Sequence, residues 1–575
     1  MPPDPDAADR LLIGPVLRRV VGTRATVWVE TATPAVVRVT AGTAAGEAHT
    51  FTAFGHHYAI VVVKGLTLGA VAPYEVWLDG ARAWPEAGDK LPPSVIRTRS
   101  PDEADQPVRM VFGSCRESTQ HASGRRLPPD ALDAYARRLA KASPVDGAGA
   151  PASGWPDLLL LLGDQVYADI TSPRVRRWLR RRRRRADAPT RQVVSFHEYT
   201  GLYLESWRDP EIRWLLSTVP SVMIFDDHEI IDDWNSSAAW RDDMRSRSWW
   251  GERIASGLAS YWVYQHLGNL SPDEIAADPI YAKVVAAGDA TEVLREFGER
   301  VDKEADVGHD PQLWRGVEYQ WSFALDLGRT RIVVLDNRCS RVLEPAHRSM
   351  LPEDEWQWLT DRVHGDYDHL VVGSSLPWLL PPGVHHLEAW NERITESSRR
   401  WIAAAGETLR RAVDLEHWAA FRLSFERLAQ LFAELGTDAQ QPGEAVGVGA
   451  GPPRSISVLS GDVHHSYVAR ADLGPEVSSP IHQLTCSPLH NQVPAIMRPP
   501  LRLGWGRSFT ALTGMLARSA GLRPPVVRWR RLAGPYFGNA VSTLVHSGQS
   551  ARVTIEGTTS DGNLRTVAEV PLSAG

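Results

Sequence analysis

A buried strand that carries functional groups at its end is predicted by the stretch Leu158-Leu159-Leu160-Leu161-Leu162-Gly163-Asp164-Gln165-Val166-Tyr167-Ala168-Asp169. A continuous apolar run that stops at a glycine is typical of a strand buried on both faces. In sheets of this kind, functional groups gather at the carboxyl ends of the strands. We therefore expect Asp164 and Tyr167 in the first turn after the strand. Taken alone, the pattern fits equally well an Asp164 that only caps the turn and a Tyr167 that only packs.

The same arrangement recurs at three other places in the chain. Apolar runs end in Gly113-Ser114-Cys115, in Asp226-Asp227-His228-Glu229 and in Gly461-Asp462-Val463-His464-His465. The four ends together offer Cys, Asp, Tyr and His, which are side chains that bind metal ions. Because carboxyl ends of strands can converge at one edge of a sheet, the recurrence predicts a metal site assembled from distant parts of the sequence.

Size and composition limit the classes of protein to which the chain can belong. The 575 residues exceed the roughly 250 to 300 at which a single hydrophobic core stops growing, so a second domain or large insertions are expected. A net charge of -6 gives no global reason to expect nucleic acid or an anionic membrane as partner. Three cysteines cannot form a disulfide framework. With no export signal and no apolar segment of membrane-spanning length, we expect a cytoplasmic protein without a membrane span.

The chain divides into two regions with different periodicity. Residues 1–100 alternate apolar and polar positions in short runs, which predicts a small β-sandwich domain. Residues 107–575 alternate strands with amphipathic helices and form the predicted catalytic domain, an α/β domain with helical insertions and helices outside its sheets. The expected helices include 195–219 and 409–435, of which the second is the longer.

The strand-end residues are suited to two metal ions. Two close ions can polarise a phosphoryl group and lower the pKa of a bridging water, which supplies a metal-bound hydroxide. Asp164 is suited to bridge the ions. A thiolate and a phenolate favour a trivalent ion such as ferric iron at one position, and oxygen donors favour Ca²⁺, Mn²⁺ or Mg²⁺ at the other. The candidates are Cys115, Tyr167 and His464 for the first ion, and Asp227 and Asp462 for the second.

His228 directly follows a candidate ligand and can reach the substrate without binding metal. We therefore expect it to act as general acid to the leaving oxygen. The neighbouring carboxylates Asp226, Asp227, Asp232 and Asp233 cannot all be ligands, and some of them are expected to face water. Cys115, considered alone, is more often a small buried apolar residue than a ligand.

Taken together and in this order, the four strand ends resemble the alkaline phosphatase D family of PhoD-type metallophosphatases. The resemblance implies a four-layer αββα core, phosphomonoesterase and phosphodiesterase activity, and an iron plus calcium centre. It also implies that Cys115, Asp164, Tyr167 and His464 hold iron and that Asp164, Asp227 and Asp462 hold calcium. Asn235 is the nearest candidate for a further calcium ligand. Arg338 resembles the arginine of the family's Asp-x-Arg strand end, so it contacts phosphate or forms a structural ion pair.

The leading hypothesis is therefore a PhoD-like alkaline phosphatase or phosphodiesterase that acts on small phosphate esters or phosphodiesters. Manganese, zinc or magnesium are alternative metals, nucleic acid enters only as a substrate, and the sequence does not indicate an oligomeric state. The alternative is a polyanion-binding protein with a degenerate metal site that uses the basic segment Arg174–Arg185. This segment is otherwise a solvated helix face. A serine esterase is disfavoured because these motifs contain no Gly-x-Ser-x-Gly elbow.

Overall fold

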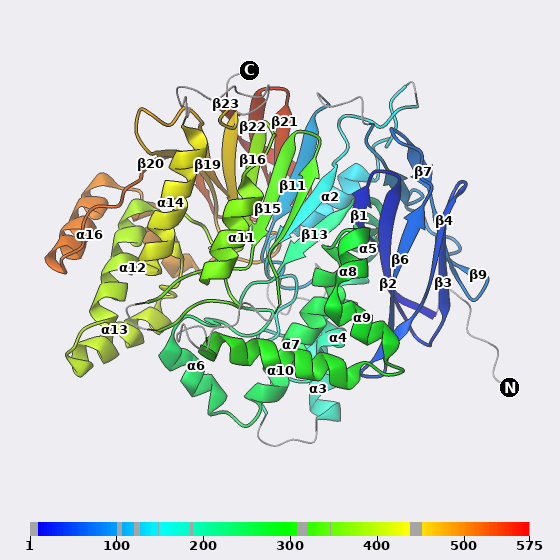
Figure 1. The fold of residues 1–575 in the computed structure, drawn as a ribbon, viewed down its shortest axis with the longest axis horizontal. Helices are drawn as coiled ribbons and strands as arrows, with labels where there is room; N and C mark the ends of the chain where they lie inside the picture. The colour runs from blue at the N-terminus through cyan, green and yellow to red at the C-terminus, as the bar shows by residue number, and fades with distance from the viewer. Residues whose placement is uncertain are drawn as a thin grey trace.

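The computed structural model describes residues 10–100, 106–119, 127–147, 149–183, 188–307, 319–344, 347–437 and 451–573, without the side chains of 304–307. It has an amino-terminal β-rich domain beside an α/β region with two large sheets (Figure 1). This is the fold class expected from the sequence.

The amino-terminal domain is built on an antiparallel sheet. Its strands are β1 (Leu11–Val21), β2 (Arg24–Thr31), β3 (Val36–Ala41), β4 (Ala44–His49), β5 (Phe51–Ala53), β6 (His56–Lys64), β8 (Glu75–Leu78) and β9 (Ala81–Trp84). They pair in the order β1-β2-β6-β4-β3-β8-β9, with β5 on β6. The strands β7 (Val71–Pro73) and β10 (Val95–Arg97) form a separate ribbon. The alternating apolar side chains share one core, as the period of two predicts.

This domain packs tightly on the rest of the chain. Trp28 of β2 lies against Trp207 at 6.2 Å and Tyr264 at 5.3 Å between ring centroids. Its apolar neighbours belong to the same buried cluster as the first large sheet. The domain boundaries at 100 and 107 stay a prediction.

Two sheets form the centre of the α/β region. The first has six strands in the order β13-β12-β11-β21-β22-β23, and the second has seven in the order β14-β15-β16-β17-β19-β18-β20. The first contains β11 (Val108–Gly113), β12 (Leu158–Leu162), β13 (Ser221–Ile224), β21 (Ala540–Ser547), β22 (Ser550–Thr558) and β23 (Leu564–Ser573). The second contains β14 (Phe323–Leu327), β15 (Thr330–Leu335), β16 (His369–Ser374), β17 (Ser455–Ser460), β18 (Ser466–Asp472), β19 (Ile481–Thr485) and β20 (Arg528–Tyr536). Strands β11–β13 run parallel, as do β15, β16, β17 and β19.

The sheets face each other and carry helices on their outer faces. In β15, Ile332 and Val334 belong to the core between the sheets, whereas Val333 and Leu335 belong to the core under the helices. A Cβ on Gly373 of β16 would lie 3.3 Å from the side chain of Leu162 in β12, which shows how closely the sheets approach. Both faces of these strands are therefore buried, which explains their unbroken apolar sequences.

The helices surround this double sheet (Figure 1). Helix α2 packs on β21 to β23, and α11 packs on β15. Among the described residues, none of the helices is long and apolar enough to cross a membrane. The helices are α2 (Ala131–Leu139), α3 (Pro173–Arg182), α4 (Phe196–Trp207), α5 (Pro210–Thr218), α6 (Ala238–Arg245), α7 (Trp250–Tyr264), α8 (Pro272–Ala277), α9 (Pro279–Ala286), α10 (Thr291–Val307), α11 (Glu353–Val363), α12 (Pro382–Thr395), α13 (Arg400–Ala412), α14 (Arg422–Gly436), α15 (Arg498–Leu503) and α16 (Arg507–Ser519), with short 3₁₀ turns η1 (His266–Gly268), η2 (Trp418–Ala420) and η3 (Ala495–Met497).

Two expected helices are each broken into two. Residues 195–219 form α4 and α5 because Pro210 starts a new helix at its first position. Residues 409–435 do not form one long helix. Helix α13 ends at Ala412, Asp414 has a positive φ of 49°, and the turn from Leu415 to Phe421 is buried before α14 begins. Tertiary burial of this turn overrides the helical pattern.

Candidate metal centre

Strand ends from both sheets meet at one edge of the double sheet. Cys115 follows β11, Asp164 follows β12, Asp227 follows β13, and Asp462 follows β17. The approach is close enough to require glycine, since a Cβ on Gly461 would lie 2.1 Å from the Ser114 hydroxyl oxygen. The glycine in the Gly-Asp-x-His motif thus lets the ends of the two sheets touch.

The first group of donors surrounds Asp164. Ligand atoms of Cys115, Asp164 and His464 all lie within 4.8 Å of one another. The Tyr167 hydroxyl donates a hydrogen bond to Asp164 Oδ2 at 3.1 Å, so it lies beside the same group. Asp164 Oδ1 is buried and has no hydrogen-bond partner among the described residues. An unsatisfied carboxylate oxygen next to a thiol and an imidazole fits a metal ion.

The backbone at these strand ends is strained. Among the described residues, nine non-glycine residues have positive φ, and five of them are candidate ligands from the sequence: Cys115, Asp164, Asn235, Asp462 and His464. Left-handed backbone costs energy for residues with a Cβ, and such strain collects at functional sites. The fold therefore holds these side chains on strained backbone, and the packing of the core does not require that strain.

The electrostatics of this group also favour a cation. Burial, reinforced by Asp164 and Asp462, raises the pKa of the Cys115 thiol well above its ordinary value. Burial, Asp164 and Cys115 likewise raise the pKa of Tyr167. These donors disfavour each other's charged forms, and a bound metal ion reverses that preference. The donor set therefore matches a metal ion better than it matches an ordinary protein interior.

A second group of donors contains a buried arginine. Ligand atoms of Asp226, Asp227 and Asp462 lie within 4.8 Å of one another. The fully buried Arg338 donates to Asp226 and lies 3.2 Å from Asp227 Oδ1 and 2.6 Å from Glu416 Oε2. Burial lowers the pKa of Arg338, but these carboxylates outweigh it and raise the pKa well above its ordinary value.

This geometry favours the structural ion pair over phosphate contact for Arg338, whose role as a phosphate ligand stays a prediction. Arg338 and Arg341 face four carboxylates, those of Asp226, Asp227, Glu416 and Asp462. Four carboxylates thus face two guanidinium groups, and Asp227 Oδ1 has no well-aligned hydrogen bond within the described chain. A divalent cation beside the guanidinium is therefore compatible with the charges present.

Asn235 lies at the rim of the second group. Its side-chain nitrogen donates to the carbonyl oxygens of Arg338 at 3.1 Å and Cys339 at 3.4 Å. These bonds fix the amide against the loop that carries Arg338. Its role as a ligand stays a prediction.

His228 is held between the two groups. Its Nδ1 lies 3.0 Å from both carboxylate oxygens of Asp169, and its ring stacks on Tyr167 with centroids 4.4 Å apart. Burial lowers the pKa of His228, but Asp169, Asp227 and Asp164 outweigh it and raise the pKa well above the ordinary range. Its ligand atom also groups with those of Asp164 and Asp227, so the geometry accommodates both a proton donor and a ligand.

Besides Arg341 and Glu416, two further residues near the site were missed by sequence reasoning. His417 Nε2 lies 3.0 Å from Asp462 Oδ2, and its Nδ1 lies 2.8 Å from Glu388. Asn491 donates a hydrogen bond to the Tyr167 hydroxyl at 3.0 Å. Asn491 follows β19 and could have been found by applying the strand-end argument once more. His417 lies in the buried turn that interrupts the expected helix 409–435, so the helical pattern did not indicate it as a site residue.

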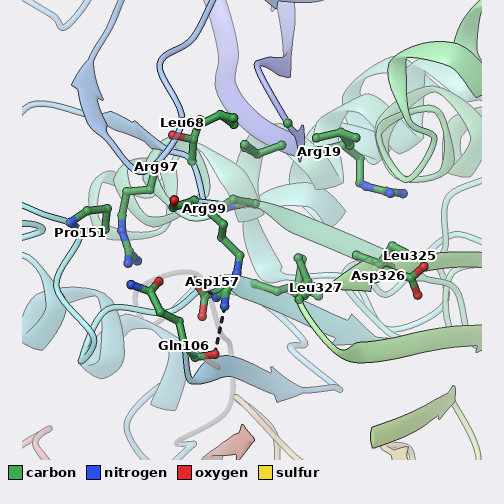
Figure 2. Close-up of a pocket in the computed structure, with 18 of the residues that line it drawn as sticks. Arg19, Leu68, Arg97, Arg99, Gln106, Pro151, Asp157, Leu325, Asp326 and Leu327 are labelled. Atoms are coloured by element: carbon green, nitrogen blue, oxygen red, sulfur yellow. Dashed lines mark hydrogen bonds and ion pairs between the residues drawn. The ribbon is translucent and has the colours of Figure 1, made fainter. Parts of the chain in front are cut away.

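A large cavity lies at the other end of the sheets. Its volume is about 630 Å³, and it opens where the strands β12, β13 and β15 begin, beside Leu158, Pro220 and Gly328. Figure 2 shows Arg97 and Arg99 at its wall, with Arg99 bonded to Gln106. Arg99 also lies 3.2 Å from Asp157. Because metal donors gather at the carboxyl ends, this cavity is not part of the metal centre.

Comparisons with known proteins found two matching family models and a similar solved structure. Residues 148–372 match the family model described as PhoD-like phosphatase, and residues 8–96 match a domain of unknown function, DUF7800. A solved structure described as "Structure of PhoD" aligns with 100% of this chain and 95% of that chain, at 12% identity and a TM-score of 0.57. At that identity, the likeness shows the fold alone. A maltogenic amylase from S. marinus aligns with 97% of this chain and 79% of its own at 7% identity, with a TM-score of 0.16 that supports no argument. No curated protein matches the chain.

The matched family segment contains Asp164, Asp226, Asp227 and His228, which lie in the donor groups described above, and Tyr167, which is hydrogen-bonded to Asp164. The likeness to the solved PhoD extends over the whole fold. Residues 148–372 therefore match a PhoD-like phosphatase domain, which supports a phosphatase-type hydrolase, and the whole chain has the fold of the solved PhoD.

Proposed function

We propose that the protein hydrolyses phosphate esters at a dinuclear metal centre in which Asp164 is shared by two ions. The observation that carries the proposal is the convergence of Cys115, Asp164 and His464 within 4.8 Å around an Asp164 oxygen without a described hydrogen-bond partner. A separate acidic group, with Asp227 and Asp462, adjoins it on the other side. One carboxylate between two donor groups is the arrangement that a two-metal hydrolase needs.

The donor types support an assignment of the ions. Cys115, Asp164, Tyr167 and His464 would hold the first ion, and a thiolate with a phenolate favours ferric iron there. Asp164, Asp227, Asp462 and Asn235 would hold the second, and these oxygen donors favour calcium. Manganese, zinc and magnesium remain the alternatives to be separated by metal analysis.

The protein's own side chains would orient the reaction. A bound metal pair supplies Lewis-acid polarisation of the phosphoryl group and acidifies the attacking water. His228 would protonate the leaving oxygen, with Asp169 fixing its ring through Nδ1 so that Nε2 is the atom that transfers the proton. The Asp169 carboxylate, 3.0 Å from His228 Nδ1, favours the protonated form of the imidazole.

The substrate would be a small phosphomonoester or phosphodiester. The exposed arginines of α3 could attract more highly charged esters, including nucleic acid as a substrate. Of the basic segment, Arg184 and Arg185 lie outside the described residues. Arg183 is engaged with Glu198 at 2.6 Å, whereas Arg180 and Arg181 are exposed.

The test is hydrolysis of a mixed panel by protein of measured metal content. The panel contains nitrophenyl phosphate, bis-nitrophenyl phosphate, an alkyl phosphomonoester and a short oligonucleotide. We expect turnover that chelation abolishes and that iron with calcium restores better than zinc or magnesium. Full activity in metal-free protein would refute the proposal, and salt-sensitive oligonucleotide binding without hydrolysis of any ester would favour the polyanion-binding alternative.

A further inference from the structure

Residues 494–531 form a segment with an unusual composition, which we call the 494–531 arm. The arm contains η3, α15, α16 and the start of β20. It carries eight arginines, and no aspartate or glutamate occurs anywhere between residues 477 and 555. In a chain with 69 acidic residues and a net charge of -6, this concentrates positive charge in one place. Seven of the eight arginines are exposed.

The arm also exposes apolar side chains. Of the twelve large hydrophobic residues that are exposed in the described part of the chain, six lie in it. They are Ile496 (81% exposed), Met497, Leu503 (59%), Leu512 (59%), Met515 (55%) and Val526. Single exposed apolar residues are ordinary, but such a concentration marks an interaction surface.

Helix α16 exposes two of its large apolar residues on the face opposite to its buried positions. Its buried positions are the small residues Thr513, Gly514 and Ala517. Its exposed positions include Leu512 and Met515, which are three residues apart and therefore share one face. Surface helices normally turn their large apolar residues inward. The solvent-facing stripe of α16 is thus apolar, with the exposed Arg507 and Arg518 near its two ends.

The arm is held firmly by the body of the protein. Gly383 of α12 donates its backbone N–H to the Gly504 carbonyl at 2.9 Å, and a Cβ at Gly383 would lie 2.4 Å from the Phe509 ring. A Cβ at Gly514 would lie 3.5 Å from His386. Figure 1 shows α16 projecting at the outer end of the molecule, beside α12. The apolar stripe therefore belongs to a docked helix whose outer face has no described neighbour.

We propose that the 494–531 arm binds the surface of an anionic lipid bilayer. A helix with an apolar face flanked by arginines lies in the interface, with apolar side chains among the acyl chains and guanidinium groups at the phosphates. Charge complementarity selects this occupant. A second copy of the arm would bring like charges together, and a nucleic acid would leave Leu512 and Met515 in water. The arm begins three residues after Asn491, whose side chain donates a hydrogen bond to Tyr167 at the metal centre.

The test is flotation of the full-length protein with vesicles, which does not depend on turnover. One set of vesicles contains phosphatidylcholine alone, and the other contains phosphatidylcholine and phosphatidylglycerol in equal parts. We expect binding to the anionic vesicles and little to the neutral ones. Since each arginine near an anionic surface contributes about fivefold, Arg518→Gln with Arg523→Gln should weaken binding by about 25-fold. Leu512→Ser with Met515→Ser should weaken it by about tenfold or more.

Matched controls distinguish binding by the arm from nonspecific binding through other exposed apolar or charged side chains. Val285→Ser removes an apolar side chain, 51% exposed on α9, and should leave binding unchanged. Arg180→Gln with Arg181→Gln removes two exposed charges from α3, outside the arm, and should reduce binding less than the arm's arginine pair. Equal binding to both vesicle types, or equal losses in arm and control variants, would overturn the proposal. So would failure to bind vesicles together with self-association that Leu512→Ser abolishes, since the occupant would then be a second copy.

Discussion

Replacing His228 by alanine tests the proposed proton donor. Its Nδ1 lies 3.0 Å from the Asp169 carboxylate, which favours a protonated imidazole beside the donor groups. Positioned acid catalysis contributes about 10² to 10⁴-fold, or about 2.7 to 5.4 kcal/mol of transition-state stabilisation. We expect His228→Ala to lose this full factor with an alkyl phosphate, whose alkoxide leaving group is a strong base.

The measurement compares kcat/KM for an alkyl phosphate and a nitrophenyl phosphate, with metal content determined for each preparation. Nitrophenolate departs without a proton, so His228→Ala should slow that ester far less. Asp169→Asn serves as a companion variant because it removes a charge that raises the His228 pKa. Activity requires the protonated form and falls as pH rises through that pKa. The basic limb of the pH profile should therefore move to lower pH in Asp169→Asn.

Equal losses with both esters would refute proton donation. Loss of bound metal along with the imidazole would make His228 a ligand, which its grouping with Asp164 and Asp227 also permits.

Three further predictions concern separate features. Tyr167→Phe should remove a visible charge-transfer band from the iron-loaded enzyme, and a colourless wild-type enzyme with full activity would exclude phenolate ligation. Arg180→Gln with Arg181→Gln should lower kcat/KM for an oligonucleotide more at low salt than at high salt and leave kcat/KM for nitrophenyl phosphate unaffected. An unchanged salt dependence would mean that the arginines of α3 are only a solvated helix face. Burial lowers the pKa of His266 to about 3. Between that value and about 6.5, the unfolded chain binds the extra proton, so stability falls as pH falls by about 1.4 kcal/mol per unit. His266→Leu should make urea-measured stability less steep in this range by that amount, and an identical slope would contradict the assignment.

The sequence predicted the strand ends because their information is local. Each apolar run buried on both faces has to become an inner strand, and the polar residue after it has to lie at the carboxyl edge. The positions of Cys115, Asp164, Asp227 and His464 follow from that rule.

The remainder of the site depends on tertiary contacts that no local pattern encodes. His417 reaches Asp462 only because the expected helix 409–435 breaks at a buried turn. Arg338 pairs with Asp226, more than a hundred positions earlier in the chain, and with Glu416, nearly eighty positions later. The sequence alone therefore left two roles for Arg338 equally open, a phosphate contact and a structural ion pair. The outward apolar face of α16 was missed for a related reason. Sequence periodicity shows that a helix has an apolar stripe, whereas only packing shows which face is buried.

If Asp164 holds two metal ions at the converging strand ends, Asp164→Asn should lose nearly all activity and bound metal, with circular dichroism like that of the wild type. Metal content and activity of this variant are the measurements to make. Asp232→Asn, which alters a nearby carboxylate that is 63% exposed and outside the proposed ligand set, should retain its metal. Wild-type activity and metal content in Asp164→Asn would contradict the claim.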